Sequence, residues 1–246
     1  MRICLALLLL TASGARAEDP PPFSLADASQ AIVVVTNDWH SVIGQLKRFE
    51  RVGSRWLQVG APIEIVVGES GLGWGLGLHP LGVGEPRKTE GDGRAPAGVF
   101  ALPSAFGQGA PAFKSAMPWL STSSELACID DPKSARYNRV IVEVEGEVKD
   151  HQTAERMQRA DGLYDVGVLV DHNGMGDSKK PAIAGRGSCV FLHIWRKKNR
   201  GTAGCTAMAR WDLEKVIEWL DPAKHPVLVQ MPKAELLKRR IPWGLP

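Results

Sequence analysis

The sequence has no long apolar run, no dominant charge of one sign and no internal repeat. A helix that crosses a bilayer needs about 20 apolar residues, and the longest apolar run, near the N-terminus, is much shorter. The formal net charge is only +3 over 246 residues, which provides no basic footprint for nucleic acid. We therefore expect no nucleic-acid partner and, once the first segment is removed, no integral membrane segment.

The first residues have the three parts of a secretory signal peptide. Arg2 gives a basic start, residues 5–10 are a short apolar core, and Ala15-Arg16-Ala17 is a small-residue cleavage site. Removing residues 1–17 takes away two arginines and no acid, so the formal charge falls from +3 to +1. We expect residues 1–17 to be a signal peptide, residues 18–30 a spacer, and the mature protein to reach the periplasm. A retained membrane anchor is the alternative.

Cysteine is scarce, and its count is informative. Three cysteines remain after the expected cleavage, namely Cys128, Cys189 and Cys205. Exported proteins usually pair their cysteines, and an odd number leaves at least one thiol free or bound to another chain. A Cys128–Cys189 disulfide would leave Cys205 free, although the sequence also permits the other pairings and buried thiols.

Short β-branched and apolar runs predict a body rich in strands and loops, and the 17 prolines and 26 glycines support this. Two stretches with apolar residues at helical spacing predict helices at 152–164 and 208–220. Strands and helices do not alternate regularly, so we expect a mainly β domain over residues 31–232 and a basic tail over 233–246. The predicted strands are 31–36, 55–59, 63–67, 139–144, 166–170, 189–194 and 226–230.

The residues with the clearest chemical potential lie between 189 and 206. One predicted strand ends at His193 and Ile194, and a glycine turn presents Cys205 twelve positions after His193. A cysteine with a histidine base is a common nucleophile. The helix expected from Met208 would stabilise its thiolate and offer N–H groups to an oxyanion. From the spacing alone, a buried thiol and a structural histidine remain an alternative.

Two motifs, in this order, resemble the L,D-transpeptidase catalytic domain family, which has the YkuD-like fold. That family carries a histidine, a spacer and a Ser/Thr-x-Gly-Cys turn, here His193 and Thr202-Ala203-Gly204-Cys205. Upstream it has Gly-Asp-Gly-x-x-Pro-x-Gly-x-Phe, here residues 91–100. The resemblance covers about residues 31–231. The chain departs from many members at Ala203, at residues 206–208 and in its shorter spacer, which leaves the substrate contacts and the choice between transfer and hydrolysis open.

The resemblance implies a β-sandwich or barrel with a few packed α-helices. It also implies an enzyme that acts on peptidoglycan stem peptides through a Cys205 thioester, without cofactor or metal. His193 is the implied base, oriented by the Ile194 carbonyl, and the N–H groups of Gly204 and Cys205 are the implied oxyanion hole. The acyl acceptor is an amine of another stem, water, or an amine of a wall-anchored protein. Candidate substrate-binding residues are Thr202, Arg196 and Arg200.

The sequence admits four other hypotheses. The chain could be a non-catalytic cell-wall-binding protein on this scaffold, or an exported cysteine protease. The segment Asp171-His172-Asn173 offers a rival base, although its glycine-rich surroundings favour a polar turn. Zinc bound by Cys189 and His193 is disfavoured, because residues four apart on a strand stand about 13 Å from each other.

Overall fold

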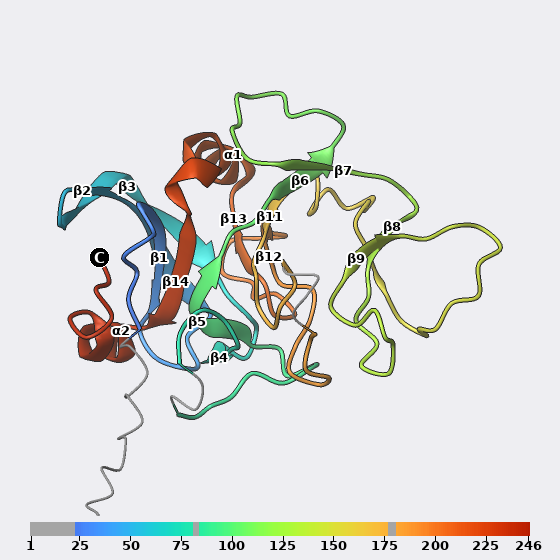
Figure 1. Ribbon diagram of the computed structural model, residues 1–246, viewed down its shortest axis with the longest axis horizontal. Helices are drawn as coiled ribbons and strands as arrows, with labels where there is room; N and C mark the ends of the chain where they lie inside the picture. The colour runs from blue at the N-terminus through green and yellow to red at the C-terminus, as the bar shows by residue number, and fades with distance from the viewer. Residues whose placement is uncertain (1–22, 81–83, 177–180) are drawn as a thin grey trace, which may run out of the picture.

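The structure, a computed structural model, describes residues 23–80, 84–176 and 181–246. The predicted signal peptide, residues 1–17, and residues 18–22 of the expected spacer lie outside these ranges. Within them, most regular structure is strand, and the prediction of a mainly β fold is confirmed (Figure 1). Two α-helices are present in the described part of the chain, α1 (Arg210–Trp219) and α2 (Lys233–Arg239).

The strands form one large mixed sheet and one small antiparallel sheet. The large sheet has eleven strands in the order β4-β5-β14-β1-β2-β3-β13-β12-β11-β6-β7, and the small one has the order β10-β8-β9. The large sheet consists of β1 (Gln30–Thr36), β2 (Ile43–Val52), β3 (Arg55–Val66), β4 (Leu72–Trp74), β5 (Ala95–Ala101), β6 (Ala105–Gln108), β7 (Trp119–Thr122), β11 (Val166–Leu169), β12 (Phe191–Ile194), β13 (Thr206–Met208) and β14 (Val227–Pro232). The small sheet consists of β8 (Leu126–Cys128), β9 (Val140–Val142) and β10 (Glu155–Arg156).

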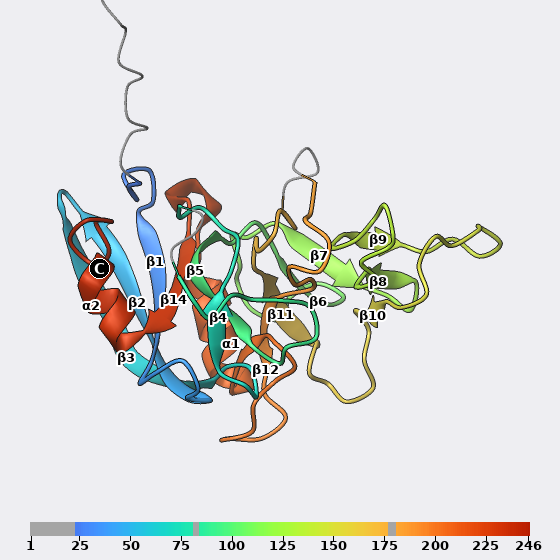
Figure 2. The same ribbon diagram turned by 90° about the horizontal axis from the view of Figure 1, so that it is seen from below.

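Strand β1 lies inside the large sheet, between parallel β14 and antiparallel β2. Its sequence is almost entirely apolar and β-branched, and its residues are almost all buried, as is typical of a strand covered on both faces. Helix α2 packs near β14 and β1, while α1 packs against β11 and β12. The small sheet lies at the other end of the molecule from α2 in both views (Figures 1 and 2).

Several observed elements differ from the predicted ones. The predicted strands 55–59 and 63–67 are one strand, β3, which runs through Gly60-Ala61-Pro62. Strand β2 was not predicted, because charged residues interrupt its apolar pattern. The predicted helix at 152–164 is wrong. That segment forms β10, which pairs with β8, and then turns. Met157 and Tyr164 are both buried there, so their burial needed no helix.

A disulfide joins the two sheets. Cys128 at the end of β8 is bonded to Cys189, two residues before β12, with the Cα atoms 5.9 Å apart. This pairing leaves Cys205 as the free cysteine among the described residues. The bond fixes the small sheet against the strand that carries His193.

The C-terminal segment is not a free basic tail. Residues 233–239 form α2, and the Arg239 guanidinium stacks on Trp74 and Trp243, 4.5 and 5.2 Å from the ring centroids. Trp243 and Leu245 are buried in the main core. Arg239 is therefore part of the packing of this end of the sheet.

No helix in the described ranges combines the length and the apolar character needed to cross a membrane.

Gly98, in the motif at residues 91–100, has no room for a side chain. A Cβ there would lie 2.0 Å from Cε1 of the buried His79, and its φ of +142° is unfavourable for other residues. We expect Gly98→Ala to lower the free energy of unfolding by at least about 3 kcal/mol, measured by urea denaturation. Gly109→Ala is the matched control, because its φ is also positive but nothing lies within 4 Å. It should cost about 1 kcal/mol. Equal losses would contradict the steric explanation.

Candidate active site

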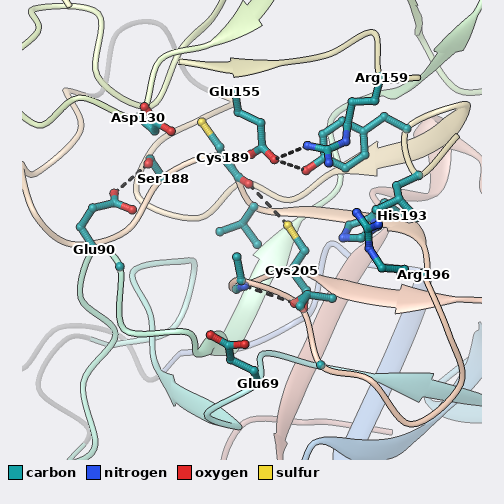
Figure 3. Close-up of a pocket in the computed structure, with 18 of the residues that line it drawn as sticks. Glu69, Glu90, Asp130, Glu155, Arg159, Ser188, Cys189, His193, Arg196 and Cys205 are labelled. Carbon is teal, nitrogen blue, oxygen red and sulfur yellow. Dashed lines mark hydrogen bonds and ion pairs between the residues drawn. The ribbon is translucent and has the colours of Figure 1, made fainter. Parts of the chain in front are cut away.

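A cavity of about 540 Å³ lies where the disulfide brings the small sheet against the large one. Its size falls in the usual range for ligand sites. Cys205 and His193 both line it (Figure 3), together with side chains of both charge signs. The acidic residues are Glu69, Glu90, Asp130 and Glu155, and the basic ones are Lys88, Arg159, Arg196 and Arg200.

Cys205 is buried, with 7% of its surface exposed. The N–H of Phe191 donates to its sulfur at 3.4 Å, and its thiol faces the carbonyl oxygen of Cys189 at 3.5 Å. These contacts are with the backbone just before and at the start of β12, so the strand that carries His193 also holds the thiol. No direct hydrogen bond joins Cys205 to His193 here, and such contacts often tighten only when substrate binds.

The turn that presents Cys205 is closed by Thr202. The Thr202 hydroxyl donates to the Cys205 carbonyl oxygen at 2.7 Å and accepts from the Gly204 N–H at 3.2 Å. The backbone of Thr202 is itself hydrogen-bonded to Val67 and Glu69, at the end of β3. Thr202, named above as a candidate substrate-binding residue, thus uses its hydroxyl to shape the turn.

The expected helix N-terminus at Cys205 is wrong. Residues 206–208 form β13, which pairs in parallel with β12, and α1 begins only at Arg210. The helix therefore cannot stabilise a Cys205 thiolate. Burial is the main cause that raises the pKa of the Cys205 thiol to about 12, and the negative charge of Glu155 adds to it. The low thiol pKa expected from the sequence is thus also wrong, because desolvation dominates.

His193, in β12, is positioned by the neighbouring carbonyl. Its Nδ1 lies 2.8 Å from the Ile194 carbonyl oxygen and donates to it, which leaves Nε2 for proton transfer. The structure thus brings together the three residues to which the resemblance assigns nucleophile, base and orienting group. Burial lowers the pKa of His193 to about 4, so the ring is neutral near pH 7 and able to accept a proton.

The two implied oxyanion donors differ in their surroundings. The Gly204 N–H is engaged by Thr202 within the turn, which leaves the Cys205 N–H as the donor of the pair outside that contact. A Cβ added to Gly204 would lie 3.2 Å from the Arg94 carbonyl oxygen. The turn therefore lies directly on the segment that contains the upstream motif.

The two arginines proposed for substrate binding are both exposed at the rim of the cavity. Arg196 forms an ion pair with Asp161 at 2.8 Å, and half of its side chain is exposed. Arg200 also lines the cavity and is exposed. Both guanidinium groups are thus open to solvent, and that of Arg196 already has an acidic partner.

The sequence did not identify Lys88, Glu155 and Tyr164 as residues of the cavity. Lys88 is buried, and its Nζ binds Asp92 at 2.6 Å. The Tyr164 hydroxyl donates to Glu155 at 2.6 Å, and its ring meets the His193 ring edge-on, with centroids 5.2 Å apart. Tyrosine occurs only twice in the sequence, and Tyr137 similarly binds Glu90 of the cavity wall. The small number of tyrosines was the one feature of the sequence that could have pointed to Tyr164.

The rival sites suggested by the sequence are not supported. His172 is fully buried, its Nδ1 accepts from the Leu76 N–H, and its Nε2 donates to the Arg186 carbonyl, so neither nitrogen remains for catalysis. The sulfur of Cys189 is in the disulfide and cannot bind zinc. Among the described residues, no group of three or more His, Cys, Asp or Glu side chains is arranged to hold a metal ion.

Comparison with known proteins gives little further information. No family model and no curated protein matches the chain. Among solved structures, Bd1075 of Bdellovibrio bacteriovorus matches with 13% identity and a TM-score of 0.42, over 89% of this chain and 56% of that one. The chain thus spans little more than half the length of that protein. A likeness this weak identifies neither a family nor a function.

Removing the hydroxyl of Thr202 should loosen the cysteine turn. We expect Thr202→Val to lower the free energy of unfolding by about 1–2 kcal/mol, because two backbone groups lose their partner. Thr202→Ser keeps the hydroxyl and should stay close to wild type. Urea denaturation measures both variants, and equal stability of the valine and serine forms would show that the hydroxyl does not hold the turn.

Three buried histidines should make stability depend on pH. Burial lowers the pKa of His79 and His193 to about 4 and that of His172 to about 3, from an ordinary value of 6.5. The unfolded chain therefore binds more protons below about pH 6.5. The free energy of unfolding should fall as pH is lowered from there to about 4, by at most about 4 kcal/mol per pH unit.

Urea titrations across this pH range measure that slope. His172→Gln should reduce this slope by the contribution of about one bound proton. His225→Gln should leave the slope unchanged, because His225 is exposed. A flat profile in the wild type would mean that the three rings are not kept neutral by the fold.

Proposed function

We propose that this protein is an exported cysteine acyltransferase of peptidoglycan stem peptides, an L,D-transpeptidase-like enzyme on a β-sandwich or barrel of the YkuD-like kind. The observation that carries the proposal is that the free thiol of Cys205 shares one cavity with His193, whose Nδ1 is fixed by the Ile194 carbonyl. The two sequence motifs, at residues 91–100 and 202–205, support the same conclusion. An exported enzyme of this class would work in the periplasm.

The first half of the reaction makes a thioester. The sulfur of Cys205 attacks the carbonyl carbon of the third stem residue, while the thiol proton passes to Nε2 of His193. The oxyanion that forms is stabilised by the Cys205 N–H and by the nearby Lys88 ammonium. His193 then returns the proton to the leaving nitrogen, the C–N bond breaks, and D-alanine departs with the proton. Because both groups start neutral, charge develops only as the bond forms.

The second half uses the same residues in reverse. An amine or a water molecule attacks the thioester carbonyl, His193 takes its proton, and the thiol of Cys205 leaves with that proton restored. An amine of a neighbouring stem gives a 3–3 cross-link, and water gives L,D-carboxypeptidase activity. An amine of a wall-anchored protein would enter by the same route. None of these steps needs a metal or an organic cofactor.

The charges of the cavity suit a ligand that carries both signs. Figure 3 shows Glu90 and Asp130 on one side of Cys205, and His193 and Arg196 on the other. A stem peptide that ends in D-alanine and contains a diamino acid offers a carboxylate for the arginines and an ammonium for the acids. The mixed cavity therefore supports a peptide substrate more than a purely anionic one.

One observation favours a second candidate, a non-catalytic wall-binding protein. The pKa of Cys205 is raised to about 12 and that of His193 is lowered to about 4, so the resting pair holds no thiolate. A module that only binds wall peptides would need neither group, and Cys205→Ala would then leave its binding unchanged.

We expect purified protein to release D-alanine from disaccharide tetrapeptides, or to form a 3–3 dimer, and Cys205→Ala to do neither. Mass spectrometry of the reaction distinguishes the hydrolytic product from the dimer, and a covalent adduct on Cys205 identifies the nucleophile. His193→Gln should slow the reaction by at least about a hundredfold, because it removes the base. Gly109→Ala, which changes a residue outside the cavity lining, is the control for effects of mutation and purification that do not involve the site.

Unchanged tetrapeptide and an unmodified Cys205, in a protein shown to be folded with its thiol reduced, would exclude this enzyme. Retained binding of the same peptides under those conditions would then establish the wall-binding module.

A further inference from the structure

Glu155 occupies an unusual position beside the nucleophile. It lies in β10, which pairs with β8 at Cys128, and its carboxylate lines the cavity. The Tyr164 hydroxyl donates to it at 2.6 Å. Arg159 approaches only to 3.7 Å and is bound more closely to Asp161, at 2.7 Å. Arg159 therefore offsets only part of the negative charge that Glu155 carries when it is ionised.

Tyr164 connects this carboxylate to the cysteine and the histidine. Its ring packs edge-on against Phe191 and His193, with centroid distances of 5.4 and 5.2 Å. Phe191 in turn donates its N–H to the sulfur of Cys205. The Tyr164 hydroxyl faces the sulfur closely enough to favour the thiolate, but in this structure its proton is donated to Glu155.

The groups around the sulfur oppose one another. Burial is the main cause that raises the pKa of Cys205, and Glu155 raises it further, whereas the Phe191 N–H, Lys88 and Tyr164 lower it. Lys88 is already paired with Asp92 at 2.6 Å, which limits its effect. Burial and the charge of Glu155 together therefore leave the thiol protonated.

The wall beside Glu155 also carries two further acids, Asp130 and Glu90. Asp130 has a buried Oδ1 without a hydrogen-bond partner among the described residues. Glu90 is held by neutral donors, Tyr137 and Ser188. Burial is the main cause that raises the pKa of Glu155, and repulsion from both acids adds to it. A buried, unpartnered carboxylate oxygen next to two further acids is satisfied best by a cationic donor.

We propose that Glu155, held by Tyr164, is an electrostatic brake on Cys205, and that a ligand ammonium bound beside Glu155 and Asp130 releases it. Glu155 acts through the proton affinity of the thiol and is a positioning residue, not a catalytic one. The proposal rests on the proposed function for the source of that ammonium, a stem peptide with a diamino acid. The nucleophile is thereby activated only when an amine-bearing substrate is in place.

The brake can be measured without turnover, by carbamidomethylation of Cys205 with iodoacetamide, read by peptide mass spectrometry across pH. Below its pKa, each unit by which that pKa falls raises the thiolate fraction about tenfold. We expect Glu155→Gln to react about tenfold faster than wild type near pH 8. Glu64→Gln is the matched control, because Glu64 is an exposed acid paired with Lys198 outside the cavity. It should react like wild type.

A second measurement needs no variant. Butylamine, which is cationic near pH 8, should accelerate alkylation of wild-type Cys205 several-fold, while 1-butanol should not. In Glu155→Gln the amine should have no effect. The proposal is overturned if Glu155→Gln reacts no faster than Glu64→Gln, or if the amine accelerates both forms equally.

These results are separable from those for the proposed function. A thiol that responds to Glu155 and to butylamine in a protein that releases no D-alanine supports the brake and refutes the proposed enzyme. Release of D-alanine with an unresponsive thiol refutes the brake alone.

Discussion

The removal of Cys205 and His193 from water is the constraint on which the rest of the site depends. Burial disfavours charge on either group, so the thiol keeps its proton and the imidazole stays neutral. The sulfur therefore lies against the backbone of Phe191 and Cys189, and the nearby Lys88 ammonium, which is paired with Asp92, does not offset the effect of burial. In the proposed reaction a proton must move as the new bond forms, and the surrounding dipoles act on the transition state more than on the resting pair.

The scaffold creates this burial by close approach of backbones that are distant in sequence. A Cβ on Gly68 would lie 2.3 Å from the Gly93 carbonyl oxygen, so the end of β3 lies directly on the motif at residues 91–100. Asp92 of that motif accepts hydrogen bonds from Lys88 and from the backbone of Arg94. Residues 91–100 thus pack against the cysteine turn, and the Cys128–Cys189 disulfide holds the small sheet on the other side of the cavity. Gly93 and Gly98 leave room for the side chains of Ser70 and His79, and Asp92 orders the loop.

The sequence predicted the parts of this site that local pattern encodes. Apolar β-branched runs identified β1, β11, β12 and β14, and the odd cysteine count required a free thiol without showing which one. It could not predict Glu155 and Tyr164, because their segment has helical spacing and only its pairing with β8 makes β10 a strand. Lys88 was missed for a related reason. Its role comes from contact with Asp92 and the cysteine turn, which is a tertiary relation with no local signal.

A protonated Cys205 thiol also protects the disulfide that lies beside it. Cys205 lies against the backbone of Cys189, whose sulfur is in the disulfide. Thiol–disulfide exchange and oxidation both proceed through the thiolate, so a permanently ionised Cys205 would threaten the bond that holds the cavity together. In an oxidising compartment that risk would be continuous. Burial, with Glu155 beside it, keeps the sulfur unreactive at rest, and the same two effects make activation depend on what fills the cavity.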